Sequence, residues 1–111
     1  MDGNILWEVI LKALKGSSIE IQTVPSNQRQ HLWFCTYLDK DRVYVRNAQN
    51  NRPSTKMNLP RIISKVDFLT VYSYYHRWVN GETNLRQEVR LLSRNTAYIF
   101  ALISHFSDTL V

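Results

Sequence analysis

Two stretches of this sequence combine aromatic and basic side chains at the spacing of a β-strand. Trp33 and Tyr37 lie four residues apart in one stretch, and Arg42, Tyr44 and Arg46 alternate in the next. Residues two or four apart on a strand point to the same face of a sheet, so pairing of the two stretches would bring these side chains together. Such a face suits single-stranded nucleic acid, because bases stack on aromatic rings and guanidinium groups neutralise phosphates.

The net charge of +5 is concentrated in one segment. Residues 42–66 contain six basic residues and no acid, whereas the rest of the chain carries eight basic and nine acidic residues. Localised positive charge attracts phosphate backbones or acidic partner proteins, although it can also be a solvated face. The predicted nucleic-acid-binding residues are Trp33, Tyr37, Arg42, Tyr44, Arg46, Arg52, Lys56 and Arg61.

No recognised catalytic or metal-binding motif is present, so the protein is more readily interpreted as non-catalytic and free of cofactors. His31, His76 and His105 show no metal-ligand spacing, and Cys35 has no CxxC partner. Three glycines are too few for a dinucleotide-binding or phosphate-binding loop. A ribonuclease-like activity stays open, because a small nuclease needs only a histidine, a tyrosine and a few basic residues.

The single cysteine also bears on the compartment. One cysteine excludes an intramolecular disulfide, which favours the reducing cytoplasm. The first residues lack a positively charged leader, and no apolar run reaches the ~20 residues that a bilayer requires. We therefore expect a cytoplasmic protein with no membrane partner.

Alternation in the first segment, aromatic content in the second, which favours a strand covered at least partly on both faces, and a return after a tight turn in the third predict three strands. They cover Ser18–Val24, His31–Leu38 and Arg42–Asn47. If a tight turn at Asp39-Lys40-Asp41 places Asp39 opposite Arg42, then one face of the hairpin pairs Leu38 with Val43 and Thr36 with Val45. The other face pairs Tyr37 with Tyr44 and Cys35 with Arg46. Because Leu38, Val43 and Val45 are the better core residues, we expect helices on their face and the aromatic face open or closed by a partner subunit.

Three helices complete the prediction. The first, Asn4–Lys15, would begin with Asn4 as its N-cap and end before Gly16. The second opens at Ser64, with Asp67 in a capping-box arrangement, and closes at Gly81. An apolar stripe at spacings of three and four predicts one long helix over Asn84–Ser107, with Ser93-Arg94-Asn95 as the place where it would kink.

The last segment admits a different interpretation. A break near Ser93 would convert it into a helix-turn-helix, with Arg94, Asn95 and Tyr98 at the start of a groove-reading helix. Arg86, Arg90 and Arg94 would line one flank of the long helix, at spacings of four. The apolar stripe, however, continues in phase across Ser93, which favours the single helix.

Together these elements predict one α+β domain over residues 1–111, with a three-stranded antiparallel sheet packed against an N-terminal helix and two C-terminal helices. The apolar excess of Asn4–Lys15 and Asn84–Ser107 predicts a homodimer through one or both helices. The leading function is non-catalytic nucleic-acid binding. The alternatives are a protein-interaction module with an acidic partner, and a small-ligand-binding protein with a pocket lined by Trp33, Tyr72 and Tyr75.

Overall fold

The computed structural model describes residues 2–22, 33–50, 59–80, 93 and 95–108. The elements within these ranges are helix α1 (Gly3–Ala13), strands β1 (Ile19–Gln22), β2 (Trp33–Asp39), β3 (Arg42–Asn47) and β4 (Arg61–Ile63), and helices α2 (Lys65–Val79) and α4 (Thr96–Asp108). The α+β class is therefore confirmed.

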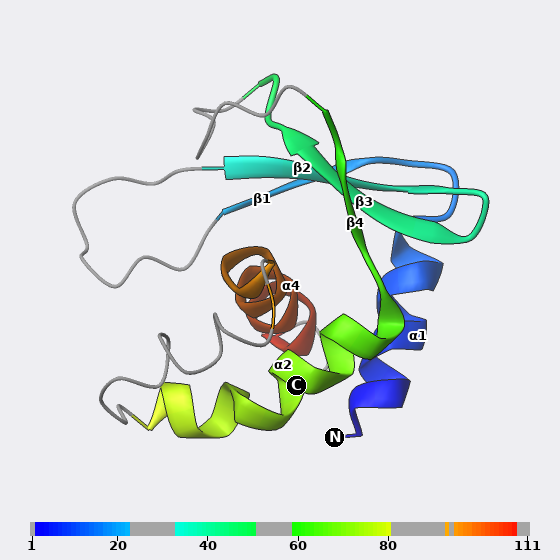
Figure 1. The fold of residues 1–111 in the computed structure, drawn as a ribbon. Helices are drawn as coiled ribbons and strands as arrows, with labels where there is room; N and C mark the ends of the chain where they lie inside the picture. Colours follow the sequence, from blue (N-terminus) through cyan, green and yellow to red (C-terminus); the bar gives the residue numbers. More distant parts are fainter. Residues whose placement is uncertain (1, 23–32, 51–58, 81–92, 94, 109–111) are drawn as a thin grey trace.

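The four strands form one antiparallel sheet in the order β1-β2-β3-β4, so the prediction of three strands was wrong. The missed strand, β4, pairs Ile63 with Val43 and Arg61 with Val45. It is only three residues long and follows Pro60, so it has too few residues to show an alternating pattern. Its pairing with β3 extends the sheet beyond the predicted hairpin (Figure 1).

The predicted register of the β2–β3 hairpin is confirmed, including the pairs Tyr37–Tyr44 and Cys35–Arg46. The loop consists of Lys40 and Asp41, whose φ angles are 51° and 63°. Two consecutive residues with positive φ are typical of a type I′ turn, whose twist matches that of the strands it joins. The turn thus fixes which residues of each strand face the helices.

All three described helices lie on one side of the sheet (Figure 1). Helix α4 runs between the sheet and α2, and α1 packs beside both helices. Five successive residues of α4, Ile99 to Ile103, are at most 1% exposed, so this helix is enclosed on all sides. The core that it forms includes Phe34 of the sheet, Phe68 of α2 and Leu6 of α1.

Helix α1 begins earlier than its predicted N-cap. Asp2, not Asn4, caps the helix, because the Asp2 carboxylate accepts the backbone N–H of Asn4 at 2.8 Å. Gly16 follows the helix with φ of 82°, in the left-handed region that favours glycine. The cap of α2 is confirmed at its start, since Ser64 Oγ accepts the N–H of Asp67 at 3.1 Å, whereas Gly81 lies outside the described residues.

The prediction of one helix over Asn84–Ser107 was wrong, because Ser93 is not helical and α4 begins at Thr96. Local hydrogen bonds mark the start of α4: Ser93 Oγ accepts the N–H of Asn95, and Thr96 Oγ1 donates to the Ser93 carbonyl. The groove-reading alternative also fails for α4, since Tyr98 is buried against Phe34. Residues 81–92, with Arg86 and Arg90, and Arg94 lie outside the described residues.

Asn95 joins the start of α4 to two other elements. Its Nδ2 donates to the Ile62 carbonyl of β4 at 3.3 Å and to Asp67 Oδ2 of α2 at 3.1 Å. Side chain hydrogen bonds of this kind hold the short β4 against the helical layer. They therefore fix the position of β4, the strand at one edge of the sheet.

Candidate nucleic-acid interface

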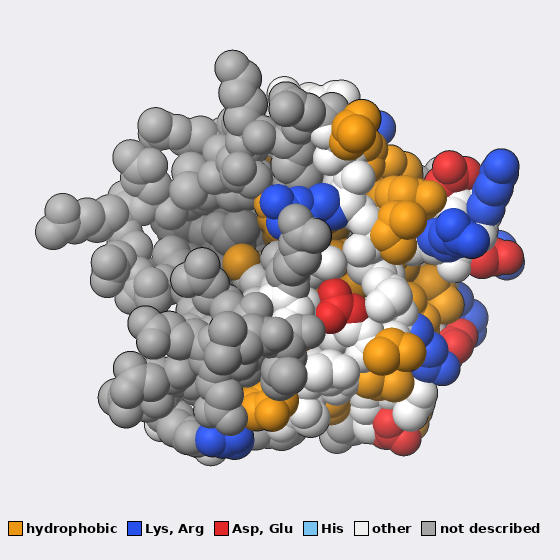
Figure 2. Space-filling model, viewed as in Figure 1, with side chains coloured by type: hydrophobic (Ala, Val, Ile, Leu, Met, Phe, Trp, Pro, Cys, Tyr) orange, Lys and Arg blue, Asp and Glu red, His pale blue; other side chains and the backbone are white. Residues whose placement is uncertain are grey.

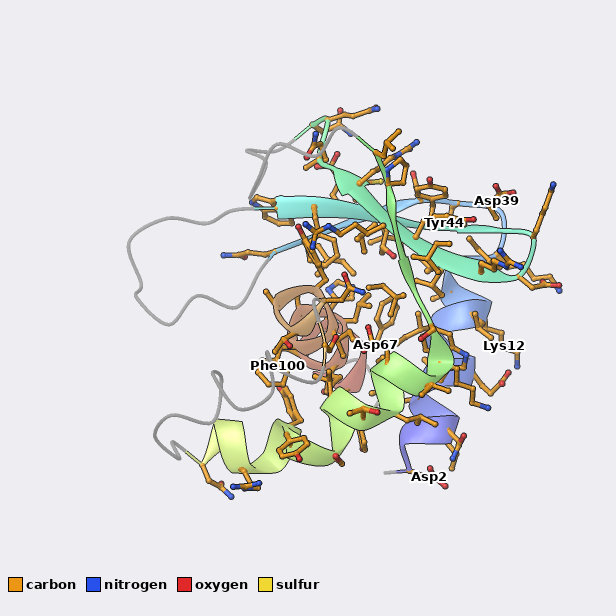
Figure 3. The ribbon with its side chains drawn as sticks, in the orientation of Figure 1. Asp2, Lys12, Asp39, Tyr44, Asp67 and Phe100 are labelled. Carbon is orange, nitrogen blue, oxygen red and sulfur yellow. The ribbon has the colours of Figure 1, made fainter. Side chains whose placement is uncertain are left out.

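The face of the sheet turned away from the helices carries the aromatic and basic side chains that the sequence predicts. Helices cover the opposite face, where Phe34, Val43 and Val45 are fully buried. Strand alternation then places Tyr37, Tyr44 and Arg46 on the other side, which we call the outer face. Tyr44 and Asp39 lie at the hairpin end of the sheet, whereas Phe100 lies between α4 and α2 (Figure 3).

Cross-strand pairing arranges the outer face in rows. One row consists of Glu20, Cys35 and Arg46, on β1, β2 and β3. The next row, two residues along β2, consists of Tyr37, Tyr44 and Ile62, on β2, β3 and β4. Trp33 begins β2 opposite Gln22, one row further in the other direction. The structure thus brings together five predicted residues: Trp33, Tyr37, Arg42, Tyr44 and Arg46.

Tyr37 is the centre of a three-residue contact. Its ring stacks with that of Tyr44 at a centroid distance of 5.3 Å and an interplanar angle of 11°. The Arg46 guanidinium carbon lies 4.7 Å from the centroid of the same ring, which is a cation–π contact. The Nε atom of Arg46 is buried and has no hydrogen-bond partner within the described part of the chain. The three side chains therefore hold one another by ring contacts, and the Arg46 charge stays beside the aromatic pair.

The charges on the strands of the outer face nearly balance. Arg42 lies directly opposite Asp39 at the hairpin end, and Arg46 shares its row with Glu20. The positive excess of residues 42–66 therefore comes from residues that follow β3. Two of these, Arg52 and Lys56, lie outside the described residues, in the connection between Asn50 and Leu59.

Arg61 is displaced from the aromatic cluster. It pairs with Val45, so strand alternation places it on the helical side of β4 and not with Tyr44. Its guanidinium carbon lies 5.9 Å from the ring centroid of Tyr98. Burial raises the pKa of the Tyr98 hydroxyl above its usual value, and the positive charge of Arg61 acts in the opposite direction. Arg61 is therefore exposed at the edge of the sheet, beside the core and away from Tyr37.

The chain after β3 returns to the first strand. Glu20 Oε2 accepts the backbone N–H of Gln49 at 2.8 Å and that of Asn50 at 2.9 Å. No sequence pattern indicated this contact, because Glu20 reads simply as the polar position of an alternating strand. The contact places the beginning of the connection that carries Arg52 and Lys56 beside the row of Glu20, Cys35 and Arg46.

One of the exposed apolar side chains lies in the aromatic row. Ile62 is 46% exposed and belongs to the row of Tyr37 and Tyr44, while Leu59 and Val66 are 79% and 76% exposed. Figure 2 shows hydrophobic side chains beside the lysine and arginine side chains at the hairpin end. Apolar, aromatic and cationic groups thus meet on this surface.

The three residues of the predicted ligand pocket are not brought together. In the helical layer, the ring centroids of Tyr75 and Phe100 lie 5.9 Å apart, and the ring of Tyr72 stacks with that of Phe68. Trp33 lies on the outer face, with the sheet between it and these tyrosines.

Two further features concern metals and membranes. Among the described residues, no group of three or more His, Cys, Asp or Glu side chains is placed to hold a metal ion. None of the helices that the structure describes has the length and apolarity needed to cross a membrane.

The chain was also compared with protein families, with curated proteins and with solved structures, and no match was found in any of the three comparisons.

Proposed function

We propose that the outer face of the sheet binds single-stranded nucleic acid without catalysis. The observation that carries this proposal is the cluster of Tyr37, Tyr44 and Arg46 on the side of the sheet that no described helix covers. Aromatic side chains on an open antiparallel sheet are a recurrent platform for unpaired bases, each stacked base contributing about 1–3 kcal/mol.

The chemistry is shared between two kinds of group. Tyr44, Tyr37 and Trp33 supply flat apolar surface for bases, and Arg42 and Arg46 supply positive charge for phosphates. Arg52 and Lys56 follow β3 in the sequence and add positive charge, whereas Arg61 adds charge only at the edge of the sheet. Binding of this type weakens with salt, because each neutralised phosphate releases counterions.

Single strands fit this surface better than a duplex does. Reading a duplex groove requires a protruding helix or ribbon, and α4, the helix whose sequence resembled a reading helix, is enclosed in the core. A sheet surface with aromatic side chains instead meets bases that are already unpaired.

A matched pair of charge variants tests the proposal. Arg42→Gln removes a positive charge from the outer face, and Lys12→Gln removes one from the exposed surface of α1, away from that face (Figure 3). With a fluorescent single-stranded oligonucleotide, Arg42→Gln should weaken binding. It should also reduce the magnitude of the negative slope of log K against log salt by about 1. Lys12→Gln should leave both nearly unchanged. Equal effects of the two variants would indicate general electrostatic attraction and would remove the outer face as the site.

A second candidate function is a protein-interaction module. The exposed apolar residues Leu59, Ile62 and Val66 favour it, because solvent-facing apolar groups are common where partner proteins bind. The absence of acids between residues 42 and 66 fits an acidic partner. Ile62→Asp would weaken such an interaction strongly. It would weaken nucleic-acid binding less, because it adds only one negative charge beside that site.

The homodimer and the cytoplasmic location are proposals as well. Core packing within one chain already uses α4, so a dimer would need the remaining apolar surface of α1, where Ile5 is 57% exposed. Light scattering at high concentration would measure the mass directly. A cytoplasmic location is supported by the free, buried thiol of Cys35.

A further inference from the structure

The carboxylate of Glu20 occupies an arrangement of donors that suits any oxyanion. Backbone N–H groups of two consecutive residues, Gln49 and Asn50, converge on one oxygen atom at 2.8 and 2.9 Å. Successive backbone N–H groups that point into one concave site are a common means of binding phosphate in proteins. Both residues are exposed, so the site lies at the surface of the protein.

Basic residues lie near these donors in the sheet row and in the sequence. Arg46 lies in the same row of the sheet as Glu20, with Cys35 between them. Its buried Nε donor has no partner within the described residues. Arg52 comes two residues after Asn50 in the sequence. Arg46, which shares the row of Glu20, and Arg52, which follows Asn50 in the sequence, are both positively charged.

The position is also close to the aromatic row. Glu20 pairs with Cys35, and Tyr37 lies two residues further along β2, which is about 7 Å in an antiparallel strand. A ligand whose base lies against Tyr37 or Tyr44 would carry its backbone within reach of Gln49 and Asn50.

We propose that the N–H groups of Gln49 and Asn50 form a phosphate-binding site that the Glu20 carboxylate fills in the free protein. This inference rests on the proposed binding of nucleic acid, and it adds competition at that site. A backbone phosphate of the bound strand displaces Glu20, and the displaced carboxylate opposes binding by its charge. Glu20 therefore lowers the affinity of the protein for nucleic acid and acts as an internal competitor.

The test begins with inorganic phosphate, so that it does not depend on nucleic-acid binding. Glu20→Gln removes the charge and nearly preserves the shape of the side chain, and Glu8→Gln makes the same change in charge on the exposed surface of α1. Amide resonances of Gln49 and Asn50 are followed by NMR as phosphate is added, against chloride at equal ionic strength. They should shift in a saturable manner in Glu20→Gln, and much less in Glu8→Gln and in the natural chain.

The second arm uses a single-stranded oligonucleotide. Glu20→Gln should bind it about three- to tenfold more tightly than Glu8→Gln does, which corresponds to one repulsive charge near the surface. If phosphate shifts the two amides in Glu20→Gln but no oligonucleotide binds, the anion site stands and the proposed function fails. If phosphate shifts them no more in Glu20→Gln than in Glu8→Gln, the anion site is overturned and Glu20 only holds the chain after β3. Should Glu20→Gln lose the fold, Glu20→Thr, which suits a strand, provides the same readout.

Discussion

Tyr37 and Tyr44 face each other across β2 and β3, with ring centroids 5.3 Å apart and ring planes within 11° of parallel. Both side chains remain partly exposed although the opposite face of the same strands is buried. The aromatic pair is therefore a partly exposed feature of the outer face that also contributes to the stability of the hairpin.

We predict a measurable coupling between these two tyrosines. Tyr37→Ala and Tyr44→Ala should each destabilise the fold, and the double variant should lose about 0.5–1.5 kcal/mol less than the sum of the two. Urea unfolding of the four proteins gives the coupling energy. Additive losses would show that the rings do not interact in solution.

The turn of the same hairpin gives a second prediction. Lys40 and Asp41 both adopt positive φ, which costs a residue with a Cβ atom roughly 1 kcal/mol, and Asn-Gly is the preferred pair for this turn. The double variant Lys40→Asn/Asp41→Gly should raise the free energy of unfolding by about 1 kcal/mol.

A variant with the opposite expected sign provides the control. Lys40→Val places a β-branched residue at positive φ and should destabilise the fold. An Asn-Gly variant no more stable than the natural chain, in urea unfolding, would contradict a type I′ turn.

The hairpin was predictable because two independent constraints agreed. A one-residue slip of the register would have moved Val43 and Val45 out of the core. The tight turn also favoured the register in which Asp39 lies opposite Arg42. Strand β4 lacked both constraints. The favoured single helix missed the start of α4, which only the alternative with a break near Ser93 placed there, since the apolar stripe continues through Ser93. The hydrogen bonds that mark this start involve only Ser93, Asn95 and Thr96. The uninterrupted run from Tyr98 to Ile103 was the available signal that α4 is enclosed on all sides.

A third prediction concerns the contact between α1 and α2. A Cβ atom on Gly3 would lie 2.9 Å from Leu69 Cδ2 and 2.9 Å from Tyr72 Cδ1, closer than packed atoms approach. Gly3→Ala should therefore destabilise the fold by about 1–3 kcal/mol through overpacking, even though alanine is the better helix former.

The matched control for this substitution lies in the same helix. Ala13 is exposed at the last position of α1, and Ala13→Gly should cost less than the roughly 1 kcal/mol of a helix interior. Thermal unfolding of both variants tests whether the preference between Ala and Gly reverses at position 3. A Gly3→Ala variant that is more stable than the natural chain would show that the two helices are not in close contact there.

A fourth prediction concerns alkaline pH. Burial raises the pKa of Tyr98, so the folded state holds this proton more tightly than the unfolded state does. The resulting stability is complete below pH 10 and is lost as pH rises through the folded pKa. Arg61→Gln removes the charge that lowers this pKa, so the phenolate absorbance of Tyr98 should appear at higher pH than in the natural chain.

Tyr98→Phe separates this residue from the other tyrosines. The spectrum of this variant, subtracted from that of the natural chain, isolates the Tyr98 titration, and the alkaline loss of stability should become smaller. Titration of Tyr98 at a lower pH in Arg61→Gln would contradict the placement of Arg61 beside its ring.

The candidate site could be predicted from the sequence only as far as one face of a strand. Tyr37, Tyr44 and Arg46 share a face because alternation within each strand is local. Arg61 appeared to belong to the same basic segment, but its side of the sheet depends on the pairing of β4. The contact of Glu20 with Gln49 and Asn50 joins residues about thirty positions apart and depends on how the chain turns after β3.

Fluorescence-anisotropy titration tests most directly whether the outer face binds single strands. The probes are single-stranded DNA, single-stranded RNA and duplex DNA, at low and at moderate salt. We predict tighter binding to at least one single strand than to the duplex, a steep loss of affinity with salt, and a large loss in the variant Tyr37→Leu/Tyr44→Leu. Absence of binding to all three probes at low salt, or unchanged binding by the double variant, would contradict the account.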